Sequence, residues 1–247
     1  TFEADALAEQ VGASGAKTVG LLIQTEACGA ALTDAVTVAL GRNGIEVLAT
    51  ASLDAGGTID AAVAAFAAEQ PDAVVVVTSQ AKATIAPLVA AGFEGDQLFF
   101  LGLPPSDYSA DFAPGALLDA VATLPGPDLP GLEDFTDRLL DIDPALVEFS
   151  YTPETYDAVI LLALAALQAD SASGADVSQQ LQAVSGGAGG GTPCVSFAAC
   201  ADIILAGGTA DYDGVSGGIA FDDNGDPAGA IIGVFRADHD NVFERID

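Results

Sequence analysis

Residues 1–122 alternate between short runs of hydrophobic residues and longer segments of mixed polarity. The runs at 18–23 and 73–77 are bounded by turn-forming residues, which is the pattern of strands buried on both faces of a parallel sheet. Further strands are expected at 45–51, 97–101 and 116–122. Helices are expected at 2–11, 30–42, 58–70 and 81–91. Strands that alternate with helices in this way predict βαβ units and a doubly wound parallel sheet.

The pattern changes after the proline-rich segment at 125–130. Three helices are expected beyond it, at 132–140, 153–169 and 177–184. Residues 125–230 otherwise contain almost no pattern of a buried strand. An amphipathic helix needs another layer to cover its apolar face. We therefore expect a lobe or a partner chain outside this sequence to cover the helix at 153–168.

Two further segments are typical of loops and turns. Residues 185–191 are rich in glycine and predict a flexible loop. Residues 218–236 contain Asn224 followed by Gly225, the strongest turn signal in the chain, and predict a hairpin. The aspartates around this turn resemble a calcium loop only superficially, because the EF-hand spacing and its final glutamate are absent. We expect no metal and no cofactor.

Composition narrows the classes of partner. The 247 residues include 6 Lys and Arg against 36 Asp and Glu, so the net charge is −30. Nucleic acids and anionic membranes need a basic surface and are excluded as partners. Because 51% of the residues are hydrophobic and only 17% are charged, the acidic chain still predicts a globular fold. Cations relieve the repulsion between so many carboxylates, which predicts a halophilic protein from a saline habitat.

The three cysteines fall into two groups. Cys28 is isolated, whereas Cys194 and Cys200 are six residues apart. A metal or redox site is one interpretation of the pair, but the chain has no CxxC spacing and His239 is its single histidine. A short local disulfide in an exported protein is the favoured interpretation, with Cys28 as a buried thiol.

The last third of the chain carries a distinctive combination of motifs. The stretch DYDGVSG at 211–217 is followed by FDDNGDP at 221–227, after the segments 18–44, 72–92 and 151–167 in that order. Together these residues resemble the extracellular solute-binding proteins of branched-chain amino-acid ABC transporters, which have the type I periplasmic-binding fold. The cysteine-containing stretch 192–200 is similar to the short disulfide loop of many members.

The resemblance implies an α/β protein with two lobes that close over a ligand. It assigns a three-layer parallel-sheet lobe, the second of the family, to residues 1–122, with 232–247 returning to it. Residues 123–231 then form a crossover and the returning helical part of the first lobe, whose N-terminal sheet has no counterpart here. The sequence is therefore interpreted as a mature or excised segment of an extracellular or periplasmic protein, tethered to a membrane through a segment that precedes Thr1.

The resemblance also implies five ligand-binding residues. Cys28 stands where the family carries an aromatic residue at the start of a helix. Thr78 and Ser79 follow a strand at another aromatic position, and Pro104 lies where amino-acid binders carry an acidic residue. Tyr151 takes the place of an aromatic residue from the second crossover.

Structural alternatives remain open for these residues. Cys28 is also explained as a buried thiol, and the hydroxyls of Thr78 and Ser79 as caps of the next helix. Three departures from the family pattern imply either a ligand other than a branched-chain amino acid or a domain that has lost ligand binding.

The leading hypothesis is non-catalytic binding of a small polar solute, such as an amino acid or an amide, for delivery to the permease of an ABC transporter. The alternative is a structural, assembly or sensing domain that reuses the fold, which a homo-oligomer with a repeated apolar interface would support. An enzyme is disfavoured. Thr1 lacks the context of an N-terminal nucleophile, and His239 lies in a terminal turn typical of an exposed loop.

Overall fold

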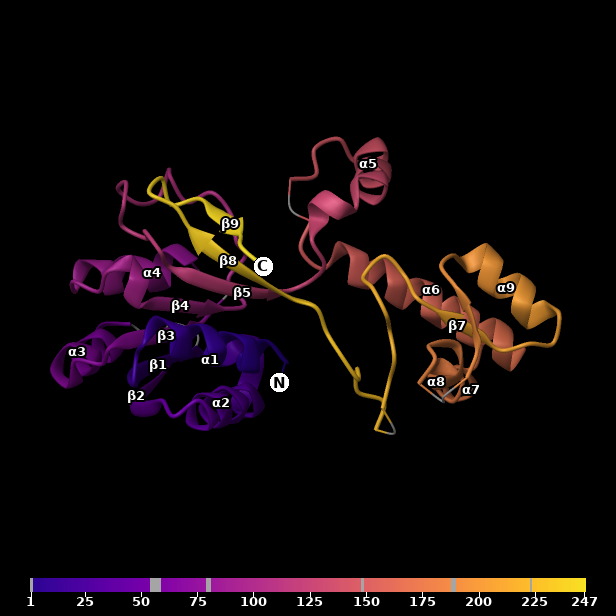
Figure 1. The fold of residues 1–247 in the computed structure, drawn as a ribbon, viewed down its shortest axis with the longest axis horizontal. Coiled ribbons are helices and arrows are strands. Elements are labelled where there is room, and N and C mark those ends of the chain that lie inside the picture. Colours follow the sequence, from indigo (N-terminus) through magenta and orange to yellow (C-terminus); the bar gives the residue numbers. More distant parts are fainter. Residues whose placement is uncertain (1, 54–58, 79–80, 148, 188–189, 223) are drawn as a thin grey trace. The chain divides into compact units, whose positions relative to one another are not determined.

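The computed structural model divides the chain into two units, which are described separately (Figure 1). Unit 1 comprises Thr1–Leu124 and Ile232–Asp247, and unit 2 comprises Pro125–Ile231. The structure describes residues 2–53, 59–78, 81–147, 149–187, 190–222 and 224–247, and leaves out the side chains of residues 25–30, 81 and 130.

A seven-stranded sheet forms the centre of unit 1, in the order β2-β1-β3-β4-β5-β8-β9. The strands are β1 (Thr18–Gln24), β2 (Glu46–Leu53), β3 (Ala73–Val77), β4 (Leu98–Leu101), β5 (Val121–Pro125), β8 (Ile232–Ala237) and β9 (Phe243–Arg245). The first five strands pair in parallel, and β8 and β9 form an antiparallel hairpin at the edge. All five residues of β3 are buried, as expected for a strand covered on both faces.

Helices cover both faces of this sheet (Figure 1). Side chains of α1 (Phe2–Ser14) and α2 (Thr25–Arg42) form one apolar cluster with alternate residues of the strands, including Leu21 and Val75. Side chains of α3 (Asp60–Glu69) and α4 (Ala81–Ala90) form a second cluster on the opposite face. The predicted three-layer α/β lobe is therefore confirmed.

Gly20 in β1 allows α3 to pack closely against the sheet. A Cβ atom at Gly20 would lie 2.6 Å from the ring of Phe66, which is fully buried. The absence of a side chain at this position thus makes room for the largest apolar residue of α3.

The strand predicted at 116–122 begins later than expected. Residues 113–120 form turns, with hydrogen bonds from Ala116 N to Ala113 O and from Ala120 N to Leu117 O. The buried side chain of Asn241 accepts a hydrogen bond from Leu117 N at 2.9 Å and stabilises this arrangement. An apolar run does not distinguish buried turns from a strand when a distant side chain satisfies the backbone.

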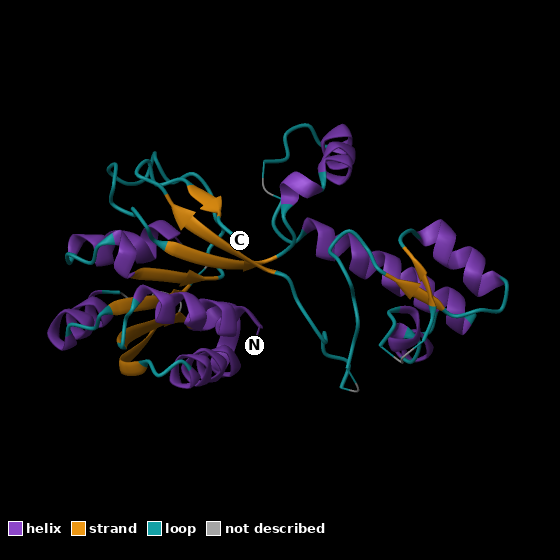
Figure 2. Ribbon diagram, in the orientation of Figure 1, coloured by secondary structure: helices purple, strands orange, loops and turns teal. Residues whose placement is uncertain are grey.

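Unit 2 contains helices around a small sheet (Figure 2). The helices are α5 (Glu133–Ile142), α6 (Thr152–Ala169), α7 (Gly174–Ser178), α8 (Leu181–Val184) and α9 (Phe197–Leu205). Two short parallel strands, β6 (Thr192–Cys194) and β7 (Ala210–Tyr212), form the sheet. Short 3-10 turns occur at Gly95–Gln97 in unit 1 and at Leu129–Gly131 in unit 2.

The helix predicted at 177–184 is divided into α7 and α8. The side chains of Ser178 and Gln179 both donate hydrogen bonds to the carbonyl oxygen of Ala175, at 3.0 and 3.1 Å. Such side-chain bonds compete with the helical backbone and are consistent with the end of the first helix at this point.

The core of unit 2 lies between α6, α8, α9 and the small sheet, and includes Leu164, Val184 and Tyr212. Helix α5 contacts α6 through Phe135 and Tyr156, whose ring centres are 5.5 Å apart, with the guanidinium group of Arg138 over both rings. The disulfide favoured by the sequence, Cys194–Cys200, joins β6 to the first turn of α9.

The turn predicted around Asn224 and Gly225 is present, but long hairpin strands do not flank it. Phe221 and Pro227 form an isolated antiparallel bridge, and Gly225 has a φ of 84°. The carboxylate of Asp222 accepts hydrogen bonds from the backbone of Asn224 and Asp226. The aspartate at the start of the turn therefore bonds to the turn's own backbone.

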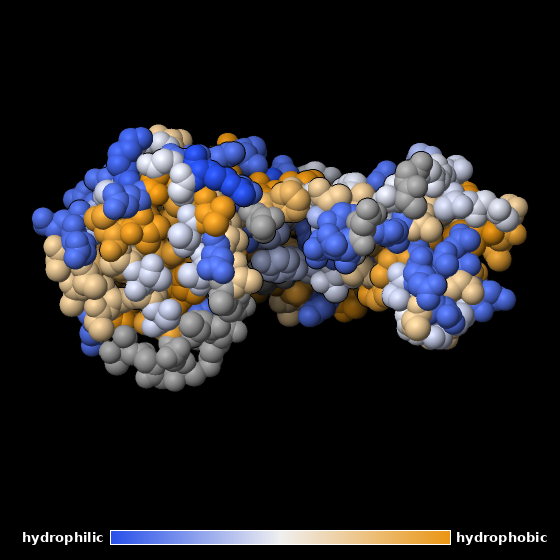
Figure 3. Space-filling model, turned by 90° about the horizontal axis from the view of Figure 1, so that it is seen from below, coloured by the Kyte–Doolittle hydropathy of each residue, from blue (hydrophilic) through white to orange (hydrophobic). Residues whose placement is uncertain are grey.

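Hydrophobic and hydrophilic surface alternate on both units (Figure 3). On α6 the exposed positions include Ala158, Val159, Leu162 and Ala163, which lie on one face at helical spacing and are all apolar. Val159 is 61% exposed and Leu162 is 51% exposed. Although α6 has an apolar sequence, no helix among the described residues is long and hydrophobic enough to cross a membrane.

Candidate functional site

The carboxyl ends of the parallel strands of unit 1 form the best candidate site. The sheet order reverses at β1, because β2 lies on one side of this strand and β3 lies on the other. Ligands of open α/β sheets bind outside the carboxyl ends of the strands, at the point where the order reverses. In this protein that point is the gap between β1 and β3.

Buried polar side chains occupy this edge. Gln24 ends β1 and Thr78 directly follows β3, and their side chains are only 8% and 2% exposed. The hydroxyl of Thr78 donates a hydrogen bond to Gln24 Oε1 at 2.9 Å, and it lies 3.2 Å from the hydroxyl of Thr84 on α4. An amide and two hydroxyls are thus held together at the reversal point, the position at which open α/β sheets bind small molecules.

Glu3 at the start of α1 brings a carboxyl group to the same edge. Its Oε1 atom accepts hydrogen bonds from the backbone of Gly102, which follows β4, at 3.2 Å and from the hydroxyl of Thr123 on β5 at 3.4 Å. Burial raises the pKa of Glu3 to about 7, although these hydrogen bonds and the charge of the amino terminus act in the opposite direction. The group therefore titrates near neutral pH.

Four of the predicted ligand-binding residues lie in unit 1, and the structure describes two of them, Thr78 and Pro104, together with their side chains. Thr78 lies in the polar cluster at the reversal point. Pro104 follows β4, and its carbonyl oxygen accepts a hydrogen bond from the hydroxyl of Tyr108 at 2.8 Å. Cys28 lies in the first part of α2, but its side chain is outside the described residues, as is the whole of Ser79.

Tyr151, the fifth predicted residue, belongs to unit 2. It precedes α6 with a φ of 61°, a left-handed conformation, and its side chain is 45% exposed. Its backbone carbonyl accepts hydrogen bonds from the amide and the hydroxyl of Thr155. Tyr151 thus marks the sharp entry of the chain into the helix.

Unit 2 also contains a cavity of about 620 Å³ between α6 and the segment that leads back to unit 1. Apolar residues form most of its wall, including Leu161, Leu162 and Ile231, and Glu154 and Asp157 add two carboxyl groups. Burial raises the pKa of Glu154, and the charge of Asp157 raises it further. The described structure contains no hydrogen-bond partner for Glu154 Oε2.

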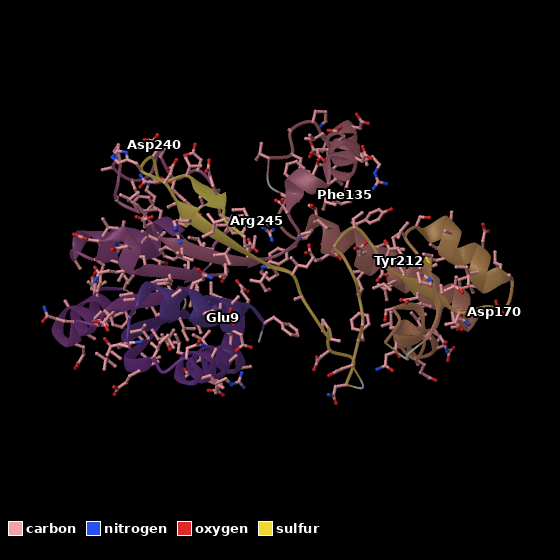
Figure 4. The ribbon with its side chains drawn as sticks, in the orientation of Figure 1. Glu9, Phe135, Asp170, Tyr212, Asp240 and Arg245 are labelled. Carbon is pink, nitrogen blue, oxygen red and sulfur yellow. A yellow bond between two sulfur atoms is a disulfide. The ribbon has the colours of Figure 1, made fainter. Side chains whose placement is uncertain are left out.

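Asp157 anchors this returning segment to α6. Its carboxylate, 1% exposed, accepts hydrogen bonds from the hydroxyl of Tyr212 at 2.7 Å, from the backbone of Val215 at 3.1 Å, and from the backbone and hydroxyl of Ser216 at 2.7 and 2.6 Å. Tyr212 comes from β7, beside α6 (Figure 4). Burial and the neighbouring carboxylate raise the pKa of the Tyr212 phenol, so the phenol remains a donor.

Gly214 makes the anchor possible, because a Cβ atom there would collide with the carboxylate of Asp157. This explains in physical terms why the DYDGVSG motif has a glycine between its aspartates and its serine. The motif binds α6 and is part of the framework of unit 2.

Sequence reasoning missed several of these residues, among them Gln24, Glu3 and Asp157. Gln24 carried a usable signal, since it is the polar residue directly after a buried strand that leads into a helix. Glu3 and Asp157 carried none, because their partners are distant along the chain. Among the described residues, no group of three or more histidine, cysteine or acidic side chains is arranged to hold a metal ion.

Comparisons with known proteins bear on the fold of the chain. The family model described as the receptor family ligand binding region matches residues 1–234. No curated protein sequence matches the chain.

Solved structures with similar folds include a leucine binding protein from Thermotoga maritima, with a TM-score of 0.70 and 16% identity over 100% of this chain and 64% of that one. A solute binding protein of an ABC transporter from R. palustris, in complex with benzoate, has a TM-score of 0.67 and 16% identity over 99% of this chain and 61% of that one. The branched-chain amino acid transporter substrate binding protein from Streptococcus pneumoniae, in complex with isoleucine, has a TM-score of 0.63 and 15% identity over 99% of this chain and 65% of that one. The chain thus spans less than two thirds of the length of these three structures.

Proposed function

Since the chain belongs to the receptor family of ligand-binding regions, we propose that it is part of a non-catalytic protein that binds a small polar solute at the carboxyl edge of the unit 1 sheet. The observation that carries the proposal is the buried cluster of Gln24, Thr78 and Thr84 at the point where the strand order reverses. Polar side chains gathered at this edge of an open α/β sheet are typical of ligand sites.

The proposed mechanism is the closure of two lobes over the solute. A ligand favours the closed state only if it makes contacts there that the open state lacks, so it must touch both lobes. In the proposal, unit 1 supplies its polar edge and a second lobe supplies the remaining contacts. The similar solved structures include a solute binding protein of an ABC transporter and a substrate binding protein of an amino acid transporter, which favours extracellular or periplasmic binding for delivery to a permease.

Thermal unfolding of the complete protein in the presence of amino acids, amides and small carboxylates tests this function. A ligand at 100 times its Kd stabilises the folded state by about 2.7 kcal/mol, so we expect at least one compound to raise the Tm by several degrees. Thr78→Val, which keeps the shape of the side chain but removes the hydroxyl, is expected to reduce that shift. The absence of a shift with every compound would contradict the proposed function.

We further propose that a sheet from additional chain covers the exposed apolar face of α6. Beyond Thr155, the exposed positions on this helix are apolar, and about a third of the leucine binding protein of similar fold lies outside the part that this sequence covers. A surface helix normally turns its polar side to water, so an apolar outer face indicates a missing layer.

The variant Val159→Thr tests this covering layer. The two side chains have similar shapes and similar helix propensities, so the change has almost no effect where Val159 faces water. In a protein that contains the covering lobe, the hydroxyl enters an apolar environment, and we expect a loss of about 1–2 kcal/mol in the free energy of unfolding. Val147→Thr, at a position 91% exposed, is the control. Equal effects of the two variants in the natural protein would show that no layer covers α6.

A further inference from the structure

The sequence contains two Asn-Gly pairs, Asn43-Gly44 and Asn224-Gly225, and the proposed function uses neither of them. Asparagine loses its side-chain amide most readily when glycine follows it, because glycine leaves the next backbone nitrogen unobstructed and free to turn. Whether a given pair reacts in a folded protein depends on how firmly its surroundings hold it. The two pairs differ in this respect.

Asn43 is held by regular structure. Its backbone amide donates hydrogen bonds to the carbonyl oxygens of Ala39 and Leu40, at 3.3 and 3.0 Å, and its side-chain amide donates to Ala39 at 3.0 Å. Ile45, two residues further on, is buried and donates a hydrogen bond to Leu40. The pair thus ends α2 and leads directly into the core of unit 1. Rotation of its peptide group requires part of the cooperative helix to open.

Asn224 is held only by its own turn. Both Asn224 and Gly225 are exposed, in the segment between β7 and β8 (Figure 1). The hydrogen bonds that the structure describes for this pair all end on Asp222. Asn224 N donates to Asp222 Oδ1 at 2.8 Å, Asn224 Nδ2 to Asp222 Oδ2 at 3.3 Å, and Gly225 N to Asp222 O at 3.0 Å. Such an exposed turn opens locally, without the unfolding of either unit.

We propose that Asn224 is a site of spontaneous modification, where the asparagine is converted to isoaspartate. The backbone nitrogen of Gly225 forms a bond to Cγ of Asn224, and the side-chain nitrogen leaves as ammonia together with the proton of the Gly225 amide. Water from the solvent then opens the resulting ring at one of its two carbonyl carbons. Opening at one carbon gives aspartate. Opening at the other gives isoaspartate, in which the backbone runs through the former side chain.

Isoaspartate at this position breaks the turn, because it lengthens the backbone by one methylene group. Asp222 Oδ1 accepts hydrogen bonds from the amides of Asn224 and Asp226, at 2.8 and 3.0 Å, and this arrangement depends on the normal spacing of the backbone. The carbonyl oxygen of Asp222 also accepts a hydrogen bond from the side chain of Gln182 on α8. The modification therefore releases the turn from α8.

The experiment follows both pairs in one sample of the complete protein, incubated at mildly alkaline pH either folded or unfolded in urea. Chymotrypsin releases the two sites in separate peptides, 41–48 and 222–235, and mass spectrometry measures the conversion of amide to acid in each. Asn43 is the internal control. The urea sample shows how fast each pair reacts without the fold.

In the folded protein we expect Asn224 to react at least about tenfold faster than Asn43, because its turn opens locally while the end of α2 does not. In urea we expect similar rates for the two pairs. Equal rates in the folded protein, or a faster reaction at Asn43, would overturn the assignment of Asn224 as the modification site.

Hydrogen exchange of the Ala228 amide, which donates to the carbonyl oxygen of Ala220 at 2.8 Å beside the turn, tests the release of the turn. We expect faster exchange in incubated wild type and no change in incubated Asn224→Gln, whose longer side chain closes the ring less readily. Asn224→Asp carries the added charge on a normal backbone and should keep its protection. Unchanged exchange in molecules that contain isoaspartate, or an equal loss of protection in Asn224→Asp, would overturn the release of the turn by the lengthened backbone.

Discussion

The variant Asp157→Ala is expected to lower the free energy of unfolding of unit 2 by about 3–5 kcal/mol. The buried carboxylate accepts four hydrogen bonds, from Tyr212, Val215 and Ser216, and alanine leaves all four donors without a partner. A hydrogen bond to a charged group contributes about 1.5–3 kcal/mol, and bonds that share one acceptor group are not additive. Hydrogen exchange of the α6 amides in urea measures the loss.

Two variants serve as controls for Asp157. Tyr212→Phe removes one of the four donors and is expected to cost about 1–2 kcal/mol. Asp170→Asn, at the exposed C-terminal end of α6, is expected to change the free energy by less than about 0.5 kcal/mol. If Asp157→Ala costs no more than Tyr212→Phe, the carboxylate is not the anchor of the returning segment.

The variant Glu3→Gln is expected to change the dependence of stability on pH. The pKa of Glu3 is about 7 in the folded protein and 4.5 in its ordinary state, so the folded protein binds this proton more tightly than the unfolded chain does. The resulting stabilisation is fully present below pH 4.5 and is lost as the pH rises through 7. Above pH 7 the wild type should therefore be less stable than Glu3→Gln by up to about 3 kcal/mol, while near pH 4.5 the two should be equal.

Urea unfolding without ligand between pH 4.5 and 8.5 measures this difference. Only the difference between variant and wild type is informative, because other carboxyl groups act in the opposite direction. Hydrogen bonds from Lys17 and Thr18 lower the pKa of Asp72, for example, so its contribution disappears in acid. The exposed control Glu9→Gln should follow the wild type. A difference that is constant with pH would show that Glu3 keeps an ordinary pKa in the folded protein.

Much of unit 1 is predictable from its sequence, because each buried parallel strand is a short apolar run with a clear end. The ends of these runs also locate the carboxyl edge of the sheet. Thr78, one of the ligand-binding residues expected from the sequence, lies at this edge. Gln24 follows from the same rule applied to β1. Strands β6, β7 and β9 have only three residues each, too few for a periodic pattern to emerge.

The interactions that were not predictable join residues far apart in the chain. Asp157 and Ser216 are separated by 59 positions, and Glu3 and Thr123 by 120. In the sequence, Glu3 and Asp157 are two of 36 acidic residues, and acidic residues near the start of a helix are common. Their importance comes from burial and from the donors around them, which only the folded chain provides.

The chain order of unit 1 has a consequence for its synthesis. Strands β1 to β5 precede residues 126–231, and strands β8 and β9 follow them, so 106 residues leave the ribosome between neighbouring strands of one sheet. Until they have done so, β5 is an unpaired edge, and Phe100 and Tyr108 lack their ring contacts with Phe243. The nascent chain must therefore remain soluble with an open edge, a condition that strong negative charge favours by keeping incomplete molecules apart.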